Sequence, residues 1–301
     1  MISIIIPLYN KEKSIVRTVH SVLEQSYQDF EIIIVNDGST DNSIRELSKV
    51  QDCRIRLVEQ PNSGVSAARN MGITIAKGEF VAFLDADDEW RNDYLQTQYD
   101  LTLKYPQCDV FATNYEFKDI RGVVSNTIIR NIPFKANEGI LSNYFTVASC
   151  SHPPLWTSAV MLRKAAIDFI GGFPVGVKSG EDLLTWARLA VRYRIAYTRS
   201  VKASFVQEGY EFKDKPKRIP ADFDVVGAEL NSLLESNANI CGLRKYISHW
   251  HKMRSSCFLR LDMYKQSVRE AFIGLKYNPF NFKLYLYILL NFIPSFMRPF
   301  K

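Results

Sequence analysis

The chain has 301 residues, of which 47% are hydrophobic and 23% charged, values close to globular averages. This composition excludes a disordered, collagen-like or coiled-coil chain, and the length suits one large or two ordinary domains. The net charge of +6 is unevenly spread, because residues 1–240 hold 27 Lys+Arg and 30 Asp+Glu (−3) whereas residues 241–301 hold 11 and 2 (+9). We therefore expect a mildly acidic body followed by a basic tail.

The cysteines and the N-terminal sequence together indicate a cytoplasmic protein. The five cysteines are odd in number, widely spaced and lack a CxxC pair, which argues against a disulfide framework or a zinc site. The first apolar run is about five residues long and ends at Pro7, so we expect no signal peptide. No stretch reaches the roughly 18 uninterrupted apolar residues of a transmembrane helix.

Short apolar strands alternate with helical patterns over the first 115 residues. We expect strands at 2–6, 30–35, 55–58, 80–84 and 110–115. Helices are expected between them, at 14–25, 41–50, 64–76 and 92–105. This alternation predicts βαβ units and a mostly parallel α/β sheet, and continuous apolar strands such as EIIIV indicate that both faces are covered.

The pattern is less regular beyond residue 115. A hairpin is expected over 116–132 with Arg121-Gly122 at its turn, then a helix at 181–193 and one or two short strands over 195–207. Residues 133–180 give no clear element apart from loops. The chain is helical after Pro220, and KDKPKRIP at 213–220 is typical of a linker. We therefore expect a body at 1–212, divided into halves at 1–115 and 116–212, and a helical basic region at 213–301.

Polar segments follow four of the expected strands. They are Tyr9-Asn10, Asn36–Ser39, Pro61–Gly64 and Asp85–Asp88. Ligands of open parallel sheets bind outside the carboxyl ends of the strands, so this edge is the predicted binding site.

Asp85 and Asp87 are the clearest metal candidates, because a hydrophobic strand delivers two carboxylates to its own end. Mg²⁺ and Mn²⁺ typically take one or two carboxylates and complete their shell with water and substrate phosphates. The alternative is an ordinary polar loop in which Asp88 caps the following helix. The pair alone is a weak signal, and the other strand-end segments strengthen it.

Three further positions have both a functional and a structural interpretation. Asp37 could accept a hydrogen bond from a nucleoside, whereas Ser39–Asn42 could simply cap the next helix. Arg69 lies in the first two turns of a helix, where it is either an exposed cation or a partner for a diphosphate. Glu181-Asp182 begins a helix, where an acid is favourable in itself or acts as a general base. The histidines show no metal-ligand spacing, and we expect His249 and His251 at the surface.

Five segments in order, IIIPLYNKEKSI, VNDGSTDNS, NSGVSAARNMGI, FLDADDEW and GEDLLTWARL, resemble glycosyltransferase family 2. The resemblance is strong over residues 1–115, weaker to about residue 195, and thin beyond. It implies a GT-A fold with a twisted, mostly parallel sheet, a Rossmann-like nucleotide-binding half and an acceptor half. It also implies a nucleotide-sugar donor, first of all a UDP-sugar, a divalent metal (Mn²⁺ or Mg²⁺) and inversion at the anomeric carbon.

The resemblance also assigns roles to single residues. Nucleoside-binding roles fall on Pro7, Tyr9 and Asp37, and donor-binding roles on Asn10, Asn62 and Ala86 at the same strand ends. Arg69 would lie near the diphosphate, Asp85 at the ribose side and the metal, and Asp87 on the metal. The base would be Asp182, with Glu181 as the alternative.

Two features depart from well-known members of the family. The Q-x-x-R-W motif of processive members is absent, which favours transfer of a single sugar over polymer synthesis. No histidine lies between Asp182 and His249, so a metal or phosphate ligand from that region remains unassigned.

The tail from 281 to 301 contains the apolar run LYLYILLNFI, which is too short to span a bilayer. Aromatic residues within it, and the cations Lys276, Lys283, Arg298 and Lys301 around it, are typical of an interfacial helix, which we place at 281–297. The alternative is a helix packed on the body or in a homodimer interface. Because the basic residues are dispersed among apolar ones, a nucleic-acid partner is not expected.

The sequence thus predicts a metal-dependent, inverting glycosyltransferase, peripheral on the cytoplasmic face of the membrane. It would transfer one sugar to a glycan or lipid-linked acceptor in the synthesis of cell-surface polysaccharide or glycoconjugate. Two alternatives remain open: a nucleotidyltransferase that makes a nucleotide sugar, although PLYNKEKS lacks the glycine of such loops, and an inactive glycosyltransferase-like binding subunit.

Overall fold

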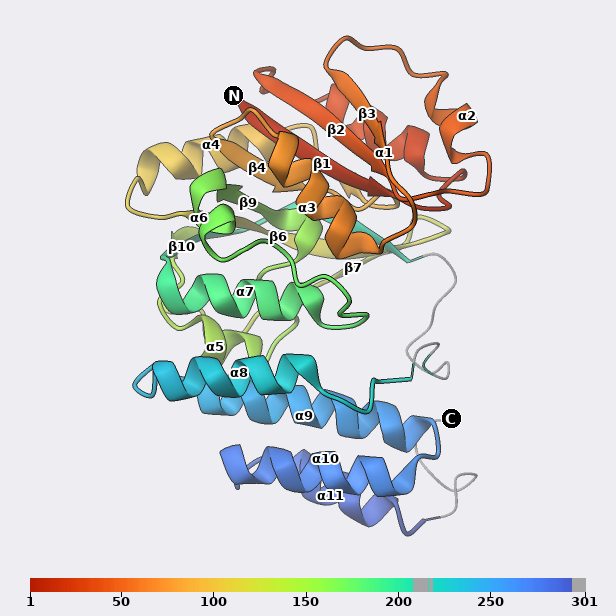
Figure 1. Ribbon diagram of the computed structural model, residues 1–301. Coiled ribbons are helices and arrows are strands. Elements are labelled where there is room, and N and C mark those ends of the chain that lie inside the picture. The colour runs from red at the N-terminus through yellow and green to blue at the C-terminus, as the bar shows by residue number, and fades with distance from the viewer. Residues whose placement is uncertain (208–215, 217–218, 294–301) are drawn as a thin grey trace. The chain divides into compact units, whose positions relative to one another are not determined.

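The computed structural model describes residues 1–207, 216 and 219–293 (Figure 1). The chain divides into two compact units. The first consists of Met1–Ser142 and Ser151–Glu208, and the second of Asn143–Cys150 and the described part of Gly209–Lys301. The expected boundary at 212/213 lies outside the described residues and stays a prediction.

The nucleotide-binding half expected at 1–115 begins with four parallel strands. They are β1 (Ile2–Leu8), β2 (Phe30–Asn36), β3 (Ile55–Glu59) and β4 (Phe80–Phe83), in the spatial order β3-β2-β1-β4. The connecting helices are α1 (Ile15–Leu23), α2 (Ser43–Leu47) and α3 (Val65–Ile75). Parallel pairing brings the carboxyl ends of these strands to one edge, as predicted.

The rest of the first unit extends this sheet into a mixed one of ten strands. β9 (Val160–Arg163) is antiparallel to both β4 and β6 (Val110–Asp119), and β10 (Ile195–Gln207) is parallel to β6. Antiparallel strands complete it: β5 (Glu89–Trp90), β7 (Val124–Asn126) and β8 (Glu138–Ile140). The pairing of β7 with β6 confirms the expected hairpin. The α/β fold class is confirmed.

Two expectations on the later elements need correction. Residues 195–207 form a single strand, as one of the two alternatives had it, but the strand is long rather than short, because shifts in register between Thr198 and Ala203 let it continue along β6. The segment 133–180 contains short elements that the sequence did not reveal, namely β8, α5 (Tyr144–Ala148), β9 and α6 (Lys164–Phe169). They have three to six residues each, too few for a periodic pattern to be recognised.

Helix α3 packs unusually close to the sheet. A side chain at Gly72 would bring its Cβ within 2.4 Å of Cγ2 of Ile5 on β1, so only glycine allows this approach. Ala68, also on α3, is buried against Ile33 and Val35 of β2. This packing fixes the start of α3, and with it Arg69, beside the strand ends. Two more helices belong to this unit, α4 (Tyr94–Lys104) and α7 (Glu181–Arg192).

The second unit is helical. It contains α5 with α8 (Val225–Ser236), α9 (Leu243–Arg260), α10 (Tyr264–Tyr277) and α11 (Phe282–Leu290), and α9 packs against all the others. Among the described residues, no helix has the length and apolar character needed to cross a membrane. Of the interfacial helix expected at 281–297, residues 294–297 lie outside the described part.

The expectation that His249 and His251 are surface residues is wrong. His251 is buried and bonds through Nδ1 to Oε2 of Glu270 at 2.7 Å, and Nδ1 of His249 lies 2.7 Å from the carbonyl oxygen of Ser149. The reason is that α9 lies in the middle of its unit, so its polar side as well as its apolar side faces other helices.

Candidate functional site

The loops after β1 and β2 are joined at the predicted edge of the sheet. Asn10 adopts a left-handed conformation with φ of 51°, and its backbone N–H donates to Oγ of Ser39 at 3.2 Å. Its side-chain oxygen accepts from the backbone N–H of Thr40 at 2.8 Å. Asn10 therefore holds the loop after β1 against the loop after β2, a role that the strand-end pattern did not specify.

Asp37 organises the loop between β3 and α3. One oxygen of its carboxylate accepts from Nε2 of Gln60 and from the backbone N–H of Ser63, at 2.7 and 2.8 Å. The other accepts from the backbone N–H of Gly64 at 2.9 Å. Asp37 is only 4% exposed, and a carboxylate offers about four acceptor positions. One position therefore remains for a ligand.

Arg69 and Asp85 form the central ion pair of the edge. Nη2 of Arg69 donates to Oδ1 of Asp85 at 2.7 Å, and Nη1 lies 3.7 Å from Oε1 of Glu181. Arg69 is 3% exposed, and its guanidinium lies 5.0 Å from the ring centre of Phe173. Nε and Nη1 have no hydrogen-bond acceptor among the described residues, so this buried cation retains donors for an anion.

Asp87 lies two residues beyond Asp85, and the basic side chains of Lys11 and Arg17 contact it. Nζ of Lys11, from the loop after β1, bonds to its carboxylate, and Nη2 of Arg17 donates to its carbonyl oxygen at 3.0 Å. The carboxylates of Asp85 and Asp87 are both partly exposed and each already binds a cationic group. This donor set fits a divalent cation, which would compete with Lys11 at Asp87.

Asp88 is a buried carboxylate that the sequence interpretation missed. It does not cap the next helix: its carboxylate accepts from Oγ of Ser158 at 2.5 Å and from the backbone N–H of Val206 on β10 at 3.1 Å. Burial, followed by the charges of Asp85 and Asp87, raises its pKa well above the usual value. Asp88 thus links the loop after β4 to Ser158 and to strand β10.

Glu181 and Asp182 open α7, directly after Gly180 in a left-handed conformation. Asp182 accepts the backbone N–H of Leu183 through Oδ1 at 2.7 Å. Burial raises the pKa of Asp182, and Arg69 opposes this shift. Burial also raises the pKa of Glu181, followed by the charge of Asp182. A carboxylate with a raised pKa is a stronger proton acceptor than an ordinary one.

The buried hydroxyl of Tyr115 on β6 accompanies this acidic group. It has no hydrogen-bond partner among the described residues, and burial followed by the charges of Tyr197, Asp182 and Asp88 raises its pKa. Sequence reasoning gave no signal for this tyrosine, because its strand reads as part of an apolar core. It adds a polar group to the acidic side of the site.

The other predicted binding residues differ in accessibility. Tyr9 is 46% exposed at the end of β1, and Asn62 is also exposed, while Pro7 is partly buried. The methyl group of Ala86 packs in the main core, which leaves only its backbone for a ligand. The backbone nitrogen of Asn62 would lie 2.9 Å from a Cβ at Gly38, so the loop carrying Asn62 passes directly over the end of β2.

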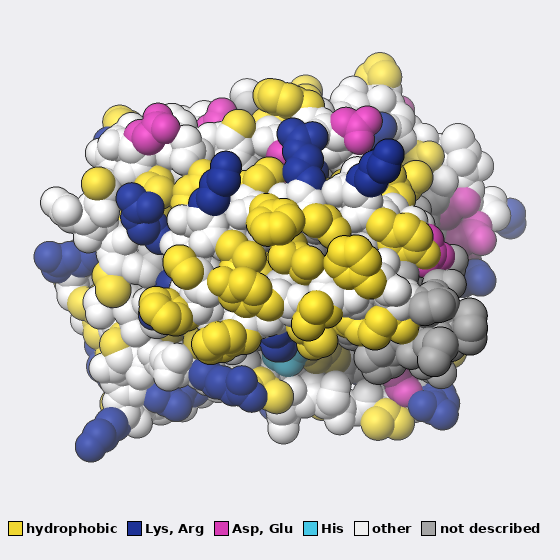
Figure 2. Space-filling view, turned by 90° about the horizontal axis from the view of Figure 1, so that it is seen from below, with side chains coloured by type: hydrophobic (Ala, Val, Ile, Leu, Met, Phe, Trp, Pro, Cys, Tyr) yellow, Lys and Arg dark blue, Asp and Glu magenta, His cyan; other side chains and the backbone are white. Residues whose placement is uncertain are grey.

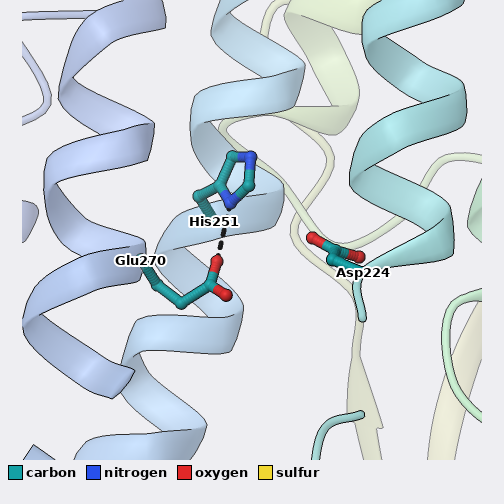
Figure 3. Close-up of side chains that lie close together, drawn as sticks. All are labelled: Asp224, His251 and Glu270. Atoms are coloured by element: carbon teal, nitrogen blue, oxygen red, sulfur yellow. Dashed lines mark hydrogen bonds and ion pairs between the residues drawn. The ribbon is translucent and has the colours of Figure 1, made fainter. Parts of the chain in front are cut away.

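A second group of potential metal ligands lies in the helical unit, at the N-cap of α8 and on α9 and α10. Asp224, His251 and Glu270 place one ligand atom each within 4.8 Å of one another (Figure 3). Arg254 supplies the cation of this cluster, with Nε 3.3 Å from Asp224 and Nη2 3.0 Å from Glu270. We interpret the cluster as an ion-pair network that holds the helices together, since both carboxylates already bind the guanidinium.

Residues 3–165, which include most of this strand-end site, match the family model of Glycosyl transferase family 2. The chain belongs to this family. The match covers the segment in which the first four quoted motifs were found.

Two relatives illustrate the membership in glycosyl transferase family 2. Glycosyltransferase GlyA of Streptococcus pneumoniae is 35% identical over 188 residues, covering 60% of this chain and 27% of GlyA. The putative teichuronic acid biosynthesis glycosyltransferase TuaG of Bacillus subtilis is 32% identical over 201 residues, covering 65% of this chain and 75% of TuaG. The match therefore spans only about a quarter of the length of GlyA.

Solved structures show the same fold. The crystal structure of S. aureus TarS 1-349 in complex with UDP-GlcNAc is similar with a TM-score of 0.68 and 19% sequence identity, and the match covers 96% of this chain and 88% of that one. The likeness confirms the GT-A-type fold expected from the sequence.

Proposed function

We propose that this protein is an inverting glycosyltransferase that moves one sugar from a UDP-sugar to a hydroxyl of a glycan or lipid-linked acceptor, in the synthesis of cell-surface polysaccharide. The observation that carries the proposal is the buried guanidinium of Arg69 between carboxylates from two elements, Asp85 after β4 and the Glu181-Asp182 pair at the start of α7. This arrangement combines a charge for a diphosphate with a base for a hydroxyl.

The donor would bind along the strand ends. Asp37 retains one acceptor position for the nucleoside, next to Tyr9, which offers an exposed ring for stacking. Nε and Nη1 of Arg69, which have no hydrogen-bond acceptor among the described residues, suit the diphosphate. TuaG is named for teichuronic acid biosynthesis and TarS binds UDP-GlcNAc in its crystals, which supports a UDP-sugar and a cell-surface product.

A divalent cation, Mn²⁺ or Mg²⁺, would be held by Asp87 and Asp85. When bound, it supplies positive charge to the diphosphate as the glycosidic bond breaks. Arg69 contributes charge to the same group from a buried position, where its electrostatic effect is strongest.

Asp182 would act as the base. Its carboxylate takes the proton of the acceptor hydroxyl while that oxygen forms a bond to the anomeric carbon. The bond from the anomeric carbon to the phosphate oxygen breaks on the opposite side, and the nucleoside diphosphate leaves with its electron pair. One displacement of this kind inverts the anomeric centre and needs no covalent intermediate.

The test compares Asp182→Asn with the matched variant Glu181→Gln. Asparagine cannot accept the proton, so transfer should fall about 10²- to 10⁴-fold while the affinity for UDP stays within about twofold. Glu181→Gln should be milder. Transfer is measured as UDP release from a panel of UDP-sugars with acceptor glycans, and binding by calorimetry with UDP.

Three results would count against parts of this assignment. If Glu181→Gln were the more damaging substitution, the base would be Glu181. If the wild type bound UDP-sugars but released no UDP with any acceptor or by hydrolysis, the protein would be an inactive binding subunit. Release of pyrophosphate from a nucleoside triphosphate and a sugar phosphate would instead indicate a nucleotidyltransferase.

A further inference from the structure

Helix α11 is apolar on both of its sides. Leu284 and Leu290 are buried against the other helices of the unit. The opposite side carries Phe282, Tyr285, Leu286 and Leu289, spaced i, i+3, i+4 and i+7, and these side chains are 45–75% exposed. The outward side of a surface helix is normally polar. Apart from Lys283, the exposed residues of α11 are therefore apolar or aromatic.

The exposed apolar surface continues beyond α11. The exposed large hydrophobic side chains of residues 264–293 form a surface that we call the α10–α11 face. They are Tyr264, Phe272, Phe280, Phe282, Tyr285, Leu286, Leu289, Phe292 and Ile293. Figure 2 shows hydrophobic side chains lying side by side across this view, with Lys and Arg on two sides of them. Contiguous apolar surfaces of this kind mark interaction sites.

The exposed charges on residues 264–293 have one sign. Residues 264–293 contain four cations, Lys265, Arg269, Lys276 and Lys283, all of them exposed. Their single acid, Glu270, is 6% exposed and is bonded to His251 and Arg254 inside the helical unit. The outward surface of the segment therefore combines aromatic and aliphatic side chains with positive charge alone.

This combination distinguishes between two occupants. In a two-fold symmetric dimer the face would pack on its own copy, and the four cations of one chain would approach those of the other. An anionic lipid surface instead offers opposite charge to the cations and an apolar interior to the rings. Aromatic side chains are also the residues that prefer the interfacial region of a bilayer.

We propose that the α10–α11 face binds the surface of an anionic lipid bilayer, with α11 lying in the plane of the interface. The apolar side chains of α11 and Phe292 enter the boundary between headgroups and acyl chains. Lys276 and Lys283 contact the anionic headgroups. The proposal is independent of the glycosyltransferase function, because it concerns other residues and has a readout without sugar chemistry.

The test measures co-sedimentation of the full chain with phosphatidylcholine vesicles, with and without phosphatidylglycerol. The wild type should bind the anionic vesicles and bind the neutral ones much less. Lys276→Gln with Lys283→Gln should weaken partition about 30-fold, since each cation near an anionic surface contributes about fivefold. Leu286→Glu with Leu289→Glu should weaken it at least as much.

Two controls keep the result interpretable. Leu103→Glu introduces the same change at an exposed leucine of α4, in the other unit, and should leave partition unchanged. UDP binding by all variants should equal that of the wild type, which separates a failure of this proposal from a failure of the proposed function. Circular dichroism checks that Leu286→Glu with Leu289→Glu is folded, and Phe292→Ser provides an independent variant.

The proposal is overturned if the folded wild type fails to bind anionic vesicles. It is also overturned if the wild type is a dimer that ignores vesicles and becomes a monomer on Leu286→Glu with Leu289→Glu, because the second copy would then be the occupant. Equal weakening by Leu103→Glu would show that added charge alone acts, and would likewise refute a role for this face.

Discussion

Arg69 on α3 donates to Asp85 after β4 at 2.7 Å, and this ion pair lies at a point where carboxylates from two separate elements meet. Burial lowers the pKa of Arg69, but Asp85, Glu181 and Asp182 outweigh that effect and the net shift is upward. The guanidinium therefore stabilises the close approach of three acids as well as offering donors to a ligand.

We expect Arg69→Gln to destabilise the fold by about 3 kcal/mol, because removing one partner of a buried pair leaves carboxylates without compensation. The measurement is urea unfolding. Arg54→Gln is the matched control, since Arg54 pairs with Asp52 nearer the surface and its loss should cost less than about 1 kcal/mol. If Arg69→Gln lost as little unfolding free energy as is expected for Arg54→Gln, Arg69 would be a ligand-binding residue without a structural role.

The strand-end site could be predicted because its residues follow strands that are themselves easy to recognise. β1, β2 and β4 are buried apolar runs, and parallel pairing forces their ends together. The polar segments that follow them therefore had to share an edge. The sequence suggested two alternative roles for Arg69, an exposed cation or a partner for a diphosphate. It did not predict the pairing of Arg69 with Asp85, because that pairing depends on the side-chain positions of two separate elements.

Asp88 shows why the rest could not be predicted. Its partners Ser158 and Val206 lie 70 and 118 residues away in the chain, and no local pattern encodes such pairing. β5 has two residues, too few for any periodicity. His251 was expected at the surface because a helical pattern does not reveal how many neighbours surround the helix, and α9 is covered on several sides.

Asp37 should matter for both stability and donor binding. Asp37→Ala removes the acceptor of three hydrogen bonds from the loop 60–64, and we expect a loss of about 2 kcal/mol in unfolding free energy. Asp37→Asn retains one oxygen and should lose about half as much. UDP binding by calorimetry should fall in the same order. Unchanged stability of Asp37→Ala would show that the loop holds its shape without this carboxylate.

His249 should make the stability depend on pH. Burial and the nearby Lys252 lower its pKa from 6.5 to about 4, so the folded protein keeps it neutral while the unfolded chain protonates it. Stability from this group is therefore complete above about pH 6.5 and is lost progressively as the pH falls towards 4, by about 3 kcal/mol in total.

His249→Gln tests this dependence. Glutamine does not titrate, so the fall in urea midpoint between pH 7.5 and pH 5 should be smaller than in the wild type. His20→Gln, at an exposed position of α1, should keep the slope of the wild type. If His249→Gln has the wild-type slope, other groups cause the acid sensitivity.

Asp87 is bonded to Nζ of Lys11. A divalent cation at Asp87 would have to displace this ammonium group, so the two cations compete for one carboxylate. Asp87→Asn should abolish metal-dependent UDP binding, because an amide is a poor substitute for a charged ligand. Lys11→Gln should strengthen Mn²⁺ binding about two- to fivefold, the range for a partly exposed ion pair.

Asp100→Asn, at an exposed position of α4, is the control and should behave as the wild type. Calorimetric titration of Mn²⁺ in the presence of UDP measures all three. Metal binding that is unchanged in Asp87→Asn would exclude this residue as a ligand, and weaker binding in Lys11→Gln would show that Lys11 supports the site instead of competing for it.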